Sequence, residues 1–438
     1  MSAVKAFVSL SFPSIVLFLL LSGPLAAADE TEQTPSQDQG SEDAGGGAQM
    51  LSFADLPSFE FGDEDFNLQI GGRIVLDAVR YSHANHRRSG FELDDARLVL
   101  SGEYRSFRWF IEPDLIGVDT PRQMYEAWGA VDLDPALRLT AGQLRVALGS
   151  EFATREEALP VTGYALTSYL DGRYDMGLRA DGIMLAGGLW YEMTATLGNG
   201  FGLEGHRRQS PQISVRLVSH PFHWIRKGAA SSLSGLFLGI ALAHSDEGDD
   251  PIVVATPLES IVFQTPDLDG DATRWRHLEL GYRSGPFRLG WENVAGCVDD
   301  VPIGGGRSQD IDQITGWSFY AAWNPTGEEH RWSQGRWVVG DFDESHAEAS
   351  GIDRPDRWEL AARYTNADID RNLFVHGITS YDRSTQEVRT INIDLSWYPV
   401  EHTRIALAWV KTIADHELNT FGGTNRDSSF LLRLALTF

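Results

Sequence analysis

The sequence predicts an all-β fold, a transmembrane antiparallel β-barrel of about 16 strands. Three observations predict it: apolar and polar side chains alternate in the last nine residues, the N-terminus looks like a secretory leader, and short strand-like runs separated by turn residues fill the rest. Together they favour a barrel in an outer membrane over a soluble sheet.

The last strand-like run, residues 430–438, has one apolar face. Phe430, Leu432, Leu434, Leu436 and Phe438 share that face. Alternation alone fits a soluble sheet and a membrane strand about equally. Because the sequence ends here without a polar tail, we expect this strand to close a barrel by pairing with the first strand. An unpaired backbone group in hydrocarbon costs several kcal/mol.

The N-terminus has the parts of a signal peptide. Lys5 gives a basic start, residues 15–21 are apolar, and residues 26–28 are alanines. We expect residues 1–28 to be a signal peptide that exports the chain to a Gram-negative outer membrane. After it, no uninterrupted apolar run approaches the roughly 20 residues that a membrane helix needs. Cys297 is the only cysteine, so an intramolecular disulfide is excluded.

The charge is concentrated at the start of the exported chain. Residues 29–65 carry eleven acidic residues and no Lys or Arg, out of a net charge of −26. This segment is too polar to fold alone, so we expect a disordered periplasmic linker, followed by a barrel over residues 66–438. The acidic excess argues against nucleic-acid binding. Lys5, Lys227 and Lys411 are the only lysines, so nearly every cation is an arginine. That bias fits either anion recognition or genomic base composition.

Short runs from residue 67 onward predict the strands. In the first, Ile74, Leu76 and Ala78 share one face, while Arg73, Val75 and Asp77 share the other. The expected strands cover residues 67–81, 96–104, 108–115, 126–133, 137–144, 183–197, 212–220, 233–244, 277–283, 287–293, 315–323, 358–365, 373–381, 388–398, 403–413 and 430–438.

Two kinds of connection separate these runs. Some are short turns, such as Asp134-Pro135 and Ser284-Gly285-Pro286. Others are long and polar, at residues 145–175, 245–272 and 324–357. Short turns at one end and long loops at the other are typical of outer-membrane barrels. A β-propeller would show blade repeats, and the sequence has none.

Several motifs resemble the phosphate-selective porin O and P family. The most specific is residues 90–98, Gly-Phe-Glu-Leu-Asp-Asp-Ala-Arg-Leu, followed by Ser101-Gly102 and by Arg108-Trp109-Phe110. The wider match includes Gly72-Arg73-Ile74 with Asp77, then residues 125–128, Leu137-Arg138-Leu139, Gly142-Gln143, residues 358–364, Trp397-Tyr398-Pro399, and the run from Thr403-Arg404 to Val410.

The resemblance implies a sixteen-stranded porin, a homotrimer, and a pore narrowed by inward-folded loops rich in cations. The resemblance does not identify the solute, and we expect a modest preference for small anions such as phosphate. The expected partners are outer-membrane lipid, lipopolysaccharide and the barrel-insertion machinery. The last would recognise the terminal strand ending in Phe438. The chain departs from the family pattern over residues 144–152, after Gly142-Gln143, where it reads Leu-Arg-Val-Ala-Leu-Gly-Ser-Glu-Phe.

Arginines are the candidate pore residues, because guanidinium groups in a water-filled lumen favour anions and can pass them along by paired hydrogen bonds. Arg73 and Arg97 lie on strand faces opposite the apolar ones. Four others cluster in or beside the longest loop before residue 183: Arg145, Arg155, Arg173 and Arg179. The alternative is that each forms an ion pair with a lumen carboxylate. In that case the acidic excess would favour a weakly selective or cation-preferring pore.

Other motifs give weaker evidence of a function. His83 and His86 lie in a polar loop without further ligands, and Asp267, Asp269 and Asp271 resemble half of a calcium loop that lacks its downstream glutamate. We therefore expect no metal, no cofactor and no enzyme activity. The alternatives to a diffusion channel are an enzyme or adhesin built on the same barrel, and a secreted glycan-binding β-protein.

Overall fold

The structure is a computed structural model. It describes residues 58–60, 66–82, 89–116, 124–197, 210–225, 231–248, 251–338, 357–400 and 402–438. The predicted signal peptide, most of the predicted linker, and His83 and His86 lie outside the described residues.

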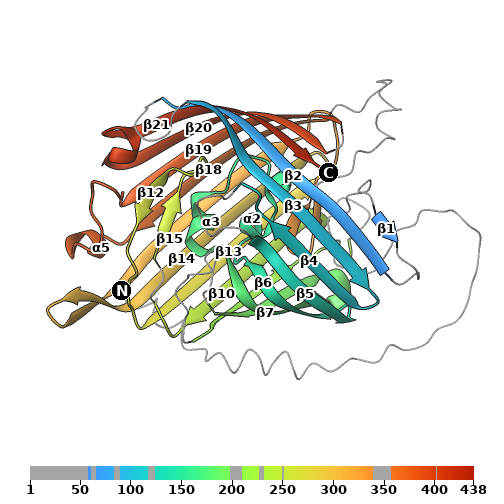
Figure 1. The fold of residues 1–438 in the computed structure, drawn as a ribbon, viewed down its shortest axis with the longest axis horizontal. Coiled ribbons are helices and arrows are strands. Elements are labelled where there is room, and N and C mark those ends of the chain that lie inside the picture. The colour runs from blue at the N-terminus through green and yellow to red at the C-terminus, as the bar shows by residue number, and fades with distance from the viewer. Residues whose placement is uncertain are drawn as a thin grey trace, which may run out of the picture. The chain divides into compact units, whose positions relative to one another are not determined.

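Sixteen antiparallel strands form the barrel (Figure 1). In chain order they are β2 (Phe66–Arg80), β3 (Gly90–Tyr104), β4 (Phe107–Pro113), β5 (Met124–Asp134), β6 (Leu137–Val146), β7 (Arg173–Met184), β8 (Leu189–Thr196), β9 (Gln212–Ser219), β10 (Leu236–Ser245), β13 (Ala272–Ser284), β14 (Phe287–Gly304), β15 (Arg307–Trp323), β18 (Arg357–Ile369), β19 (Glu387–Val400), β20 (Thr403–Leu418) and β21 (Thr424–Thr437).

The last strand pairs with the first, as the sequence predicts. β21 pairs antiparallel with β2 from Arg73 opposite Thr437 to Arg80 opposite Phe430. Gly72 and Phe438 then exchange backbone hydrogen bonds of 2.7 and 3.0 Å. A short strand, β1 (Ser58–Glu60), pairs with the part of β2 that β21 leaves uncovered. The sheet is therefore closed, and its backbone polar groups are satisfied within it.

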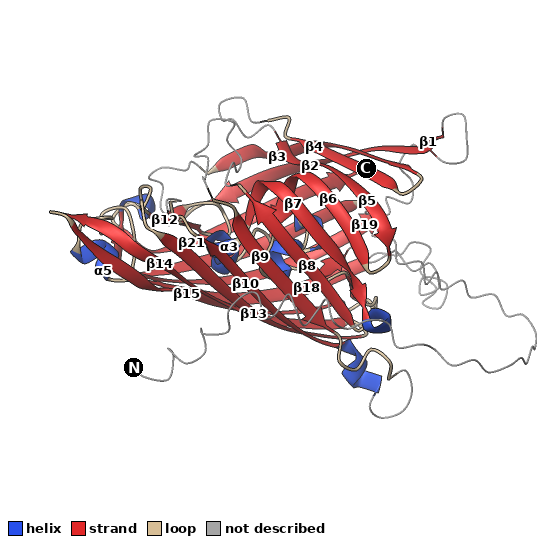
Figure 2. Cartoon of the chain, turned by 90° about the horizontal axis from the view of Figure 1, so that it is seen from below, coloured by secondary structure: helices blue, strands red, loops and turns tan. Residues whose placement is uncertain are grey.

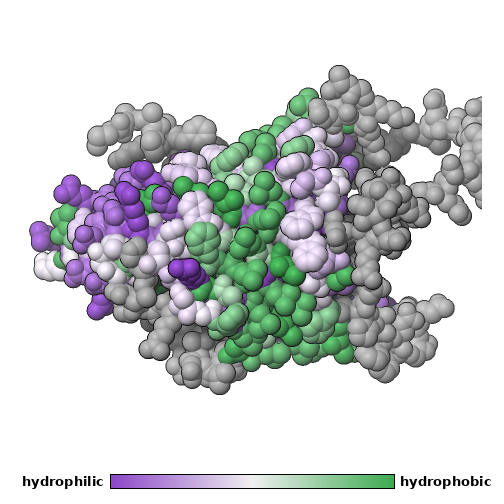
Figure 3. All heavy atoms as spheres, turned by 90° about the horizontal axis from the view of Figure 1, so that it is seen from above, coloured by the Kyte–Doolittle hydropathy of each residue, from purple (hydrophilic) through white to green (hydrophobic). Residues whose placement is uncertain are grey.

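The strands alternate as expected for a membrane barrel. Outward side chains are apolar and exposed, for example Leu407 at 54% and Leu432 at 51%, whereas inward neighbours such as Arg73 and Arg433 are buried. Figure 3 shows these outward side chains as an apolar band between more polar ends. Stacked aromatic pairs, Phe287 with Trp323 and Trp358 with Trp397, lie on the outward face near one end of the strands. Such aromatic girdles mark the edge of the hydrocarbon layer.

The two ends of the barrel differ. We call the end with Phe438 the turn end, because residues 105–106, 135–136 and 285–286 reverse the chain there. The opposite end, which carries residues 147–172 and 246–271, is called the loop end. No helix in the described part of the chain is long and apolar enough to cross a membrane.

Three sequence predictions were wrong. The expected strand at 373–381 is a short helix, α5 (Asn372–Val375), with turns. The strand β7 was not predicted: the expected loop 145–175 and the expected strand 183–197 overlap only its two ends. The two errors cancel, so the predicted number of strands is still correct. The segment 324–356 joins β15 to β18 at the turn end, not at the end with the long loops.

Further short elements lie in the connections rather than in the wall, among them α3 (Leu166–Asp171) and β12 (Ile261–Gln264), which are labelled in Figure 2. Loop L3, residues 147–172, contains α2 (Ser150–Ala153) and α3. The 246–271 loop contains a hairpin of β11 (Val253–Ala255) and β12. The turn-end segment contains β16 (Arg331–Ser333) and β17 (Arg336–Val338), which pair only with each other and which we call the lumen hairpin.

We predict that a charge on the outward face destabilises the barrel. Leu407→Arg places a guanidinium in the apolar band, where it should lower the free energy of unfolding by about 2–4 kcal/mol if Leu407 lies at mid-depth. Urea unfolding in lipid vesicles, followed by tryptophan fluorescence, measures this change. Leu407→Met is the matched control and should unfold like the wild type. Equal stability of the arginine variant would show that this face is not in lipid.

Candidate functional site

Loop L3 crosses the inside of the barrel and is bound to the wall on the side of β14 to β20. Asp394 of β19 accepts hydrogen bonds from the backbone N–H and the hydroxyl of Thr162, both at 2.7 Å. Arg404 of β20 donates to the carbonyl of Leu159 at 2.9 Å, and Arg288 of β14 donates to the carbonyl of Ala158 at 3.1 Å. These wall groups satisfy backbone atoms that would otherwise be buried without partners.

The first helix of L3 is held by two buried charges. Glu292 of β14 accepts from the backbone N–H of Glu151 at 2.7 Å and from the hydroxyl of Ser150. Arg363 of β18 forms an ion pair with Glu151 and donates to the carbonyl of Gly163 at 2.9 Å. Arg363 and Glu151 are 2% exposed. At this degree of burial, removing either partner would leave an unpaired charge and would strongly lower the free energy of unfolding.

The opposite side of L3 is bound to β2, β3, β4 and β5. Arg73 pairs with Glu156 of L3 at 2.9 Å, and Arg155 of L3 pairs with Glu112 at 3.0 Å and with Glu126 at 3.3 Å. Burial disfavours the charged form of Glu156, but Arg73 and Arg97 outweigh that cost and hold the pKa of Glu156 below its usual range. L3 is therefore bound to the barrel wall on both sides. Because its pKa is lowered, Glu156 stays ionised in acid.

Arg97 and Arg145 are also paired. Arg97 contacts Asp95 at 2.8 Å and Glu112 at 3.3 Å, and its guanidinium lies 3.5 Å from the centre of the Tyr125 ring. Arg145, at the end of β6, donates to the carbonyls of Phe152 and Thr154 at 3.1 and 3.2 Å. Both guanidinium groups are buried, so their contacts position L3 and its surroundings.

The other two predicted arginines lie in β7, not in a loop. Arg179 faces the lumen and pairs with Asp181 at 3.2 Å. Arg173 is the first residue of β7, half-buried, and opposite Val146 in register. The structure thus brings Arg73, Arg97 and Arg155 into one network around Glu112 and Glu156. Arg173 lies at the loop end of β7.

The resemblance implied loops rich in cations, and L3 does not fit that expectation. It contains Arg155 as its only cation, against four acidic residues. The lumen cations come from the wall strands instead. Among the described residues that are buried, thirteen are carboxylic acids and nine are arginines, so the interior has no excess of positive charge.

Several lumen arginines were not predicted from the sequence, and Arg336 is one of them. Arg336, in the lumen hairpin, is half-buried, and its guanidinium makes no hydrogen bond or ion pair within the described part of the chain. Burial, together with its electrostatic neighbours Arg155, Arg179 and Arg145, lowers the pKa of Arg336 to about 10. No sequence pattern indicated it, because the hairpin belongs to a segment predicted to be an external loop.

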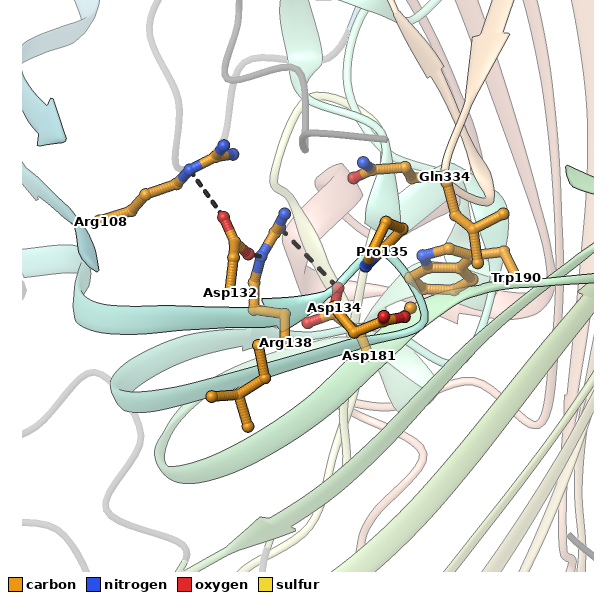
Figure 4. Close-up of a pocket in the computed structure, with 11 residues that line it drawn as sticks. Arg108, Asp132, Asp134, Pro135, Arg138, Asp181, Trp190 and Gln334 are labelled. Carbon is orange, nitrogen blue, oxygen red and sulfur yellow. Dashed lines mark hydrogen bonds and ion pairs between the residues drawn. The ribbon is translucent and has the colours of Figure 1, made fainter. Parts of the chain in front are cut away.

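A cavity of about 360 Å³ lies at the turn end beside the tip of the lumen hairpin (Figure 4). Arg108 and Arg138 flank Asp132 at 2.9 and 2.6 Å, and Arg138 also lies 3.8 Å from Asp181. Trp190 and Gln334 complete the opposite side. All of these wall side chains face the lumen, so the cavity is lumen space that the hairpin leaves unfilled.

A second, smaller cavity lies next to L3 and is mainly acidic. Asp77, Glu92, Asp94, Glu156 and Glu259 line it. Within the described ranges, Asp77, Glu92 and Asp94 form the one carboxylate group compact enough to hold a metal ion, with oxygens within 4.8 Å of one another. Arg433 already pairs with Asp77 and Asp94, at 2.7 and 2.5 Å. The predicted half calcium loop, Asp267, Asp269 and Asp271, forms no such group.

The remainder of the loop end is filled by an apolar cluster. Val254, Val262 and Phe263 of the 246–271 loop pack with Leu166 and Leu170 of α3, and this group continues onto inward residues of β10 to β20. Gly163 of L3, with φ of +70°, lies so close to the carbonyl of Pro257 that a Cβ atom there would come within 2.0 Å of it. These contacts join L3 to the 246–271 loop. The polar space that is left therefore lies mainly along β2 to β8.

The structure offers a serine and a histidine near one carboxylate, as an enzyme would need. Ser150 donates to Glu292, and His277 Nε2 lies 3.4 Å from the same carboxylate. The serine hydroxyl thus bonds to the acid rather than to the histidine, and all three groups are buried. This arrangement anchors L3 and lacks the nucleophile-to-base hydrogen bond of a hydrolase.

Comparisons with known proteins agree on the fold. No family model matches the sequence, and no characterised relative matches it. Solved structures do match: the outer-membrane channel DcaP of Acinetobacter baumannii has a TM-score of 0.53 and 11% identity, over 87% of this chain and 100% of that one.

Two further barrels match to a similar degree. OmpF of Salmonella typhi in complex with daunomycin has a TM-score of 0.51 and 11% identity, over 87% of this chain and 100% of that one. OprB of Pseudomonas putida has a TM-score of 0.51 and 9% identity, over 85% and 94% of the two chains. At these identities the likeness shows the fold alone: a sixteen-stranded barrel of the outer-membrane porin type.

We predict that L3 depends on the Arg363–Glu151 pair. Arg363→Ala leaves Glu151 buried without its guanidinium, which should cost about 3–5 kcal/mol of stability and loosen the loop. Limited trypsin digestion, read at the bond after Arg155, and urea unfolding both measure this change. The double variant Arg363→Met with Glu151→Gln removes both charges and should recover most of the loss. Unchanged trypsin resistance in Arg363→Ala would refute this role of the pair.

Proposed function

We propose that the chain is a passive diffusion channel for small charged solutes in a bacterial outer membrane, and that it is not an enzyme. The observation that carries the proposal is the contrast between the two faces of the closed sheet. The outer face is apolar and the inner face is charged, which is the arrangement of a barrel with lipid outside and water inside. A secreted soluble β-protein would not expose such a band.

The proposed orientation places the turn end in the periplasm, because short turns face the periplasm in barrels of this type. The signal peptide of residues 1–28 would export the chain. The insertion machinery would then recognise the strand that ends in Phe438. Outer-membrane lipid and lipopolysaccharide would surround the apolar band, and three copies would assemble, as the resemblance to the porin O and P family implies.

The proposed solute path follows the polar side of the lumen, from the turn-end cavity past Arg179 and Arg336 toward Arg155 under L3. Of these three guanidinium groups, Arg336 lacks a carboxylate partner, so it is the one best able to bind a passing anion such as phosphate. The other predicted arginines would contribute mainly to the electrostatic potential of the lumen: Arg73, Arg97, Arg145 and Arg173. Because carboxylates balance most of these charges, the preference for anions should be weak.

A planar-bilayer recording of the purified protein tests the channel itself. Discrete steps of conductance are expected, with a small reversal potential in a salt gradient. Protein that inserts into the bilayer and carries no current would refute the proposal.

We predict that Arg336→Ala shifts the reversal potential toward cation preference, since it removes the one unpaired positive charge of the described lumen. The recording uses a tenfold gradient of potassium chloride. Arg276→Ala is the matched control, because Arg276 is exposed on the outward face of β13 and should leave the potential unchanged. An equal potential for wild type and Arg336→Ala would show that Arg336 does not contact the permeating ions.

A further inference from the structure

The lumen hairpin enters the barrel from the turn end. Its strands turn through Gln334 and Gly335, which have φ of +48° and +73°, the pattern of a tight two-residue hairpin. At its base, the carbonyl of His330 accepts from Arg283 at 3.0 Å, and the N–H of His330 donates to the carbonyl of Gly285 in the β13–β14 turn at 3.3 Å. The segment therefore begins at the turn end and reaches inward from there.

The hairpin occupies part of the lumen and buries the side chain of Trp337 there. Trp337 is 1% exposed, within a cluster of Val218, Phe237, Tyr320 and Trp332. Its ring lies 4.9 Å from that of Trp332, which stacks on Phe237 with 3.6 Å between ring centres. Water-filled lumens are lined by polar groups, so this inward-facing aromatic cluster serves to hold the hairpin.

The second strand of the hairpin, β17, contacts L3. The backbone N–H of Trp337 donates to the hydroxyl of Thr154 at 3.1 Å. Arg216 of β9 donates to the carbonyl of Gly335 at 2.6 Å. The hairpin and L3 together thus span the lumen from the turn end to its centre.

The way the hairpin is held differs from the way L3 is held. L3 is tied by buried ion pairs on both sides, whereas β16 and β17 share no backbone pairing with the wall. The strands behind the hairpin, β8, β9 and β10, are each paired on both edges, so the barrel is complete without it.

Two further features favour displacement of the hairpin. It places Arg336 near Arg155, Arg179 and Arg145, whose like charges oppose its position and offset the attraction of Glu126 and Glu192. The cavity of about 360 Å³ beside Gln334 offers free volume on the turn-end side.

We propose that the lumen hairpin, residues 331–338, is a removable plug and that its withdrawal toward the turn end widens the channel. The inference rests on the proposed channel function. L3 stays in place during this change, and Trp337 is the anchor that keeps the hairpin inserted. The closed position is the one seen in the structure.

Bilayer conductance of three variants of the full chain tests this plug. Trp337→Ala removes the anchor, and deletion of residues 331–338 with a short Gly-Ser replacement removes the plug. Both should raise the single-channel conductance several-fold or lengthen the time spent in a larger open level. Trp358→Ala is the matched control, because it removes a tryptophan from the outward face and should conduct like the wild type.

A covalent lock tests the same inference without relying on the deletion to fold. In a Cys297→Ser background, Phe237→Cys with Trp332→Cys removes the stacked pair and should give the enlarged conductance. A short bifunctional thiol reagent then ties the hairpin to β10 and should return the conductance to the wild-type level. Conductance that is unaffected by both the lock and Trp337→Ala would overturn the plug.

The outcomes separate this inference from the proposed function. A wild type that conducts, with variants that conduct equally, contradicts the plug and leaves the channel intact. A wild type that conducts, with Trp337→Ala and deletion variants that conduct several-fold more, supports both. A wild type that inserts and carries no current contradicts the proposed channel even where the deletion variant conducts. If neither conducts although both migrate as folded, heat-modifiable barrels, the channel function and the plug fail together.

Discussion

The absence of water from the hydrocarbon layer is the constraint on which the rest of the structure depends. Backbone N–H and C=O groups there must bond within the protein, and a sheet can satisfy all of them only by closing on itself. The pairing of β2 with β21, completed by Gly72 and Phe438, does this. Closure also fixes the size of the hole, because a ring of sixteen strands is too wide for side chains alone to fill.

The charged side chains of the barrel wall explain why L3 folds into the lumen. Inward-facing arginines and carboxylates are costly to bury singly, and L3 supplies partners for them from both sides of the lumen. Asp394 and Arg404 satisfy its backbone on one side, and Arg73 and Glu112 pair with its charges on the other. The same contacts that stabilise the interior therefore hold L3 across the lumen.

Period-two alternation predicted the inward face of Arg73 and Arg97, and together with the predicted signal peptide and the cost of unpaired backbone groups in hydrocarbon it predicted a closed barrel. It failed for β7, where Gly177 and Gly182 interrupt a strand whose inward face is charged, and for α5, whose apolar residues pack in the loop-end cluster rather than in a strand. The 324–356 segment was assigned to the wrong end because it is long and polar, and Arg336 and Trp337 were therefore not recognised as lumen residues.

The sequence predicted some of the residues of the candidate site but not the contacts between them. The sequence indicated which arginines could face the lumen, but not that Arg97 and Arg145 would be held by Glu112, Tyr125 and the carbonyls of L3. Pairings between residues far apart in the chain depend on how L3 folds, and no local pattern encodes them. The relation to one porin family likewise remains a prediction from motifs, since the structural matches extend to the fold and no further.

Osmotic swelling of liposomes that contain the purified protein tests the central claim most directly, because it measures passage of solute rather than a property of the fold. In isotonic solutions of small charged solutes, the account predicts swelling that slows steeply as the solute becomes larger. Liposomes that contain the folded barrel and swell no faster than protein-free liposomes would contradict it.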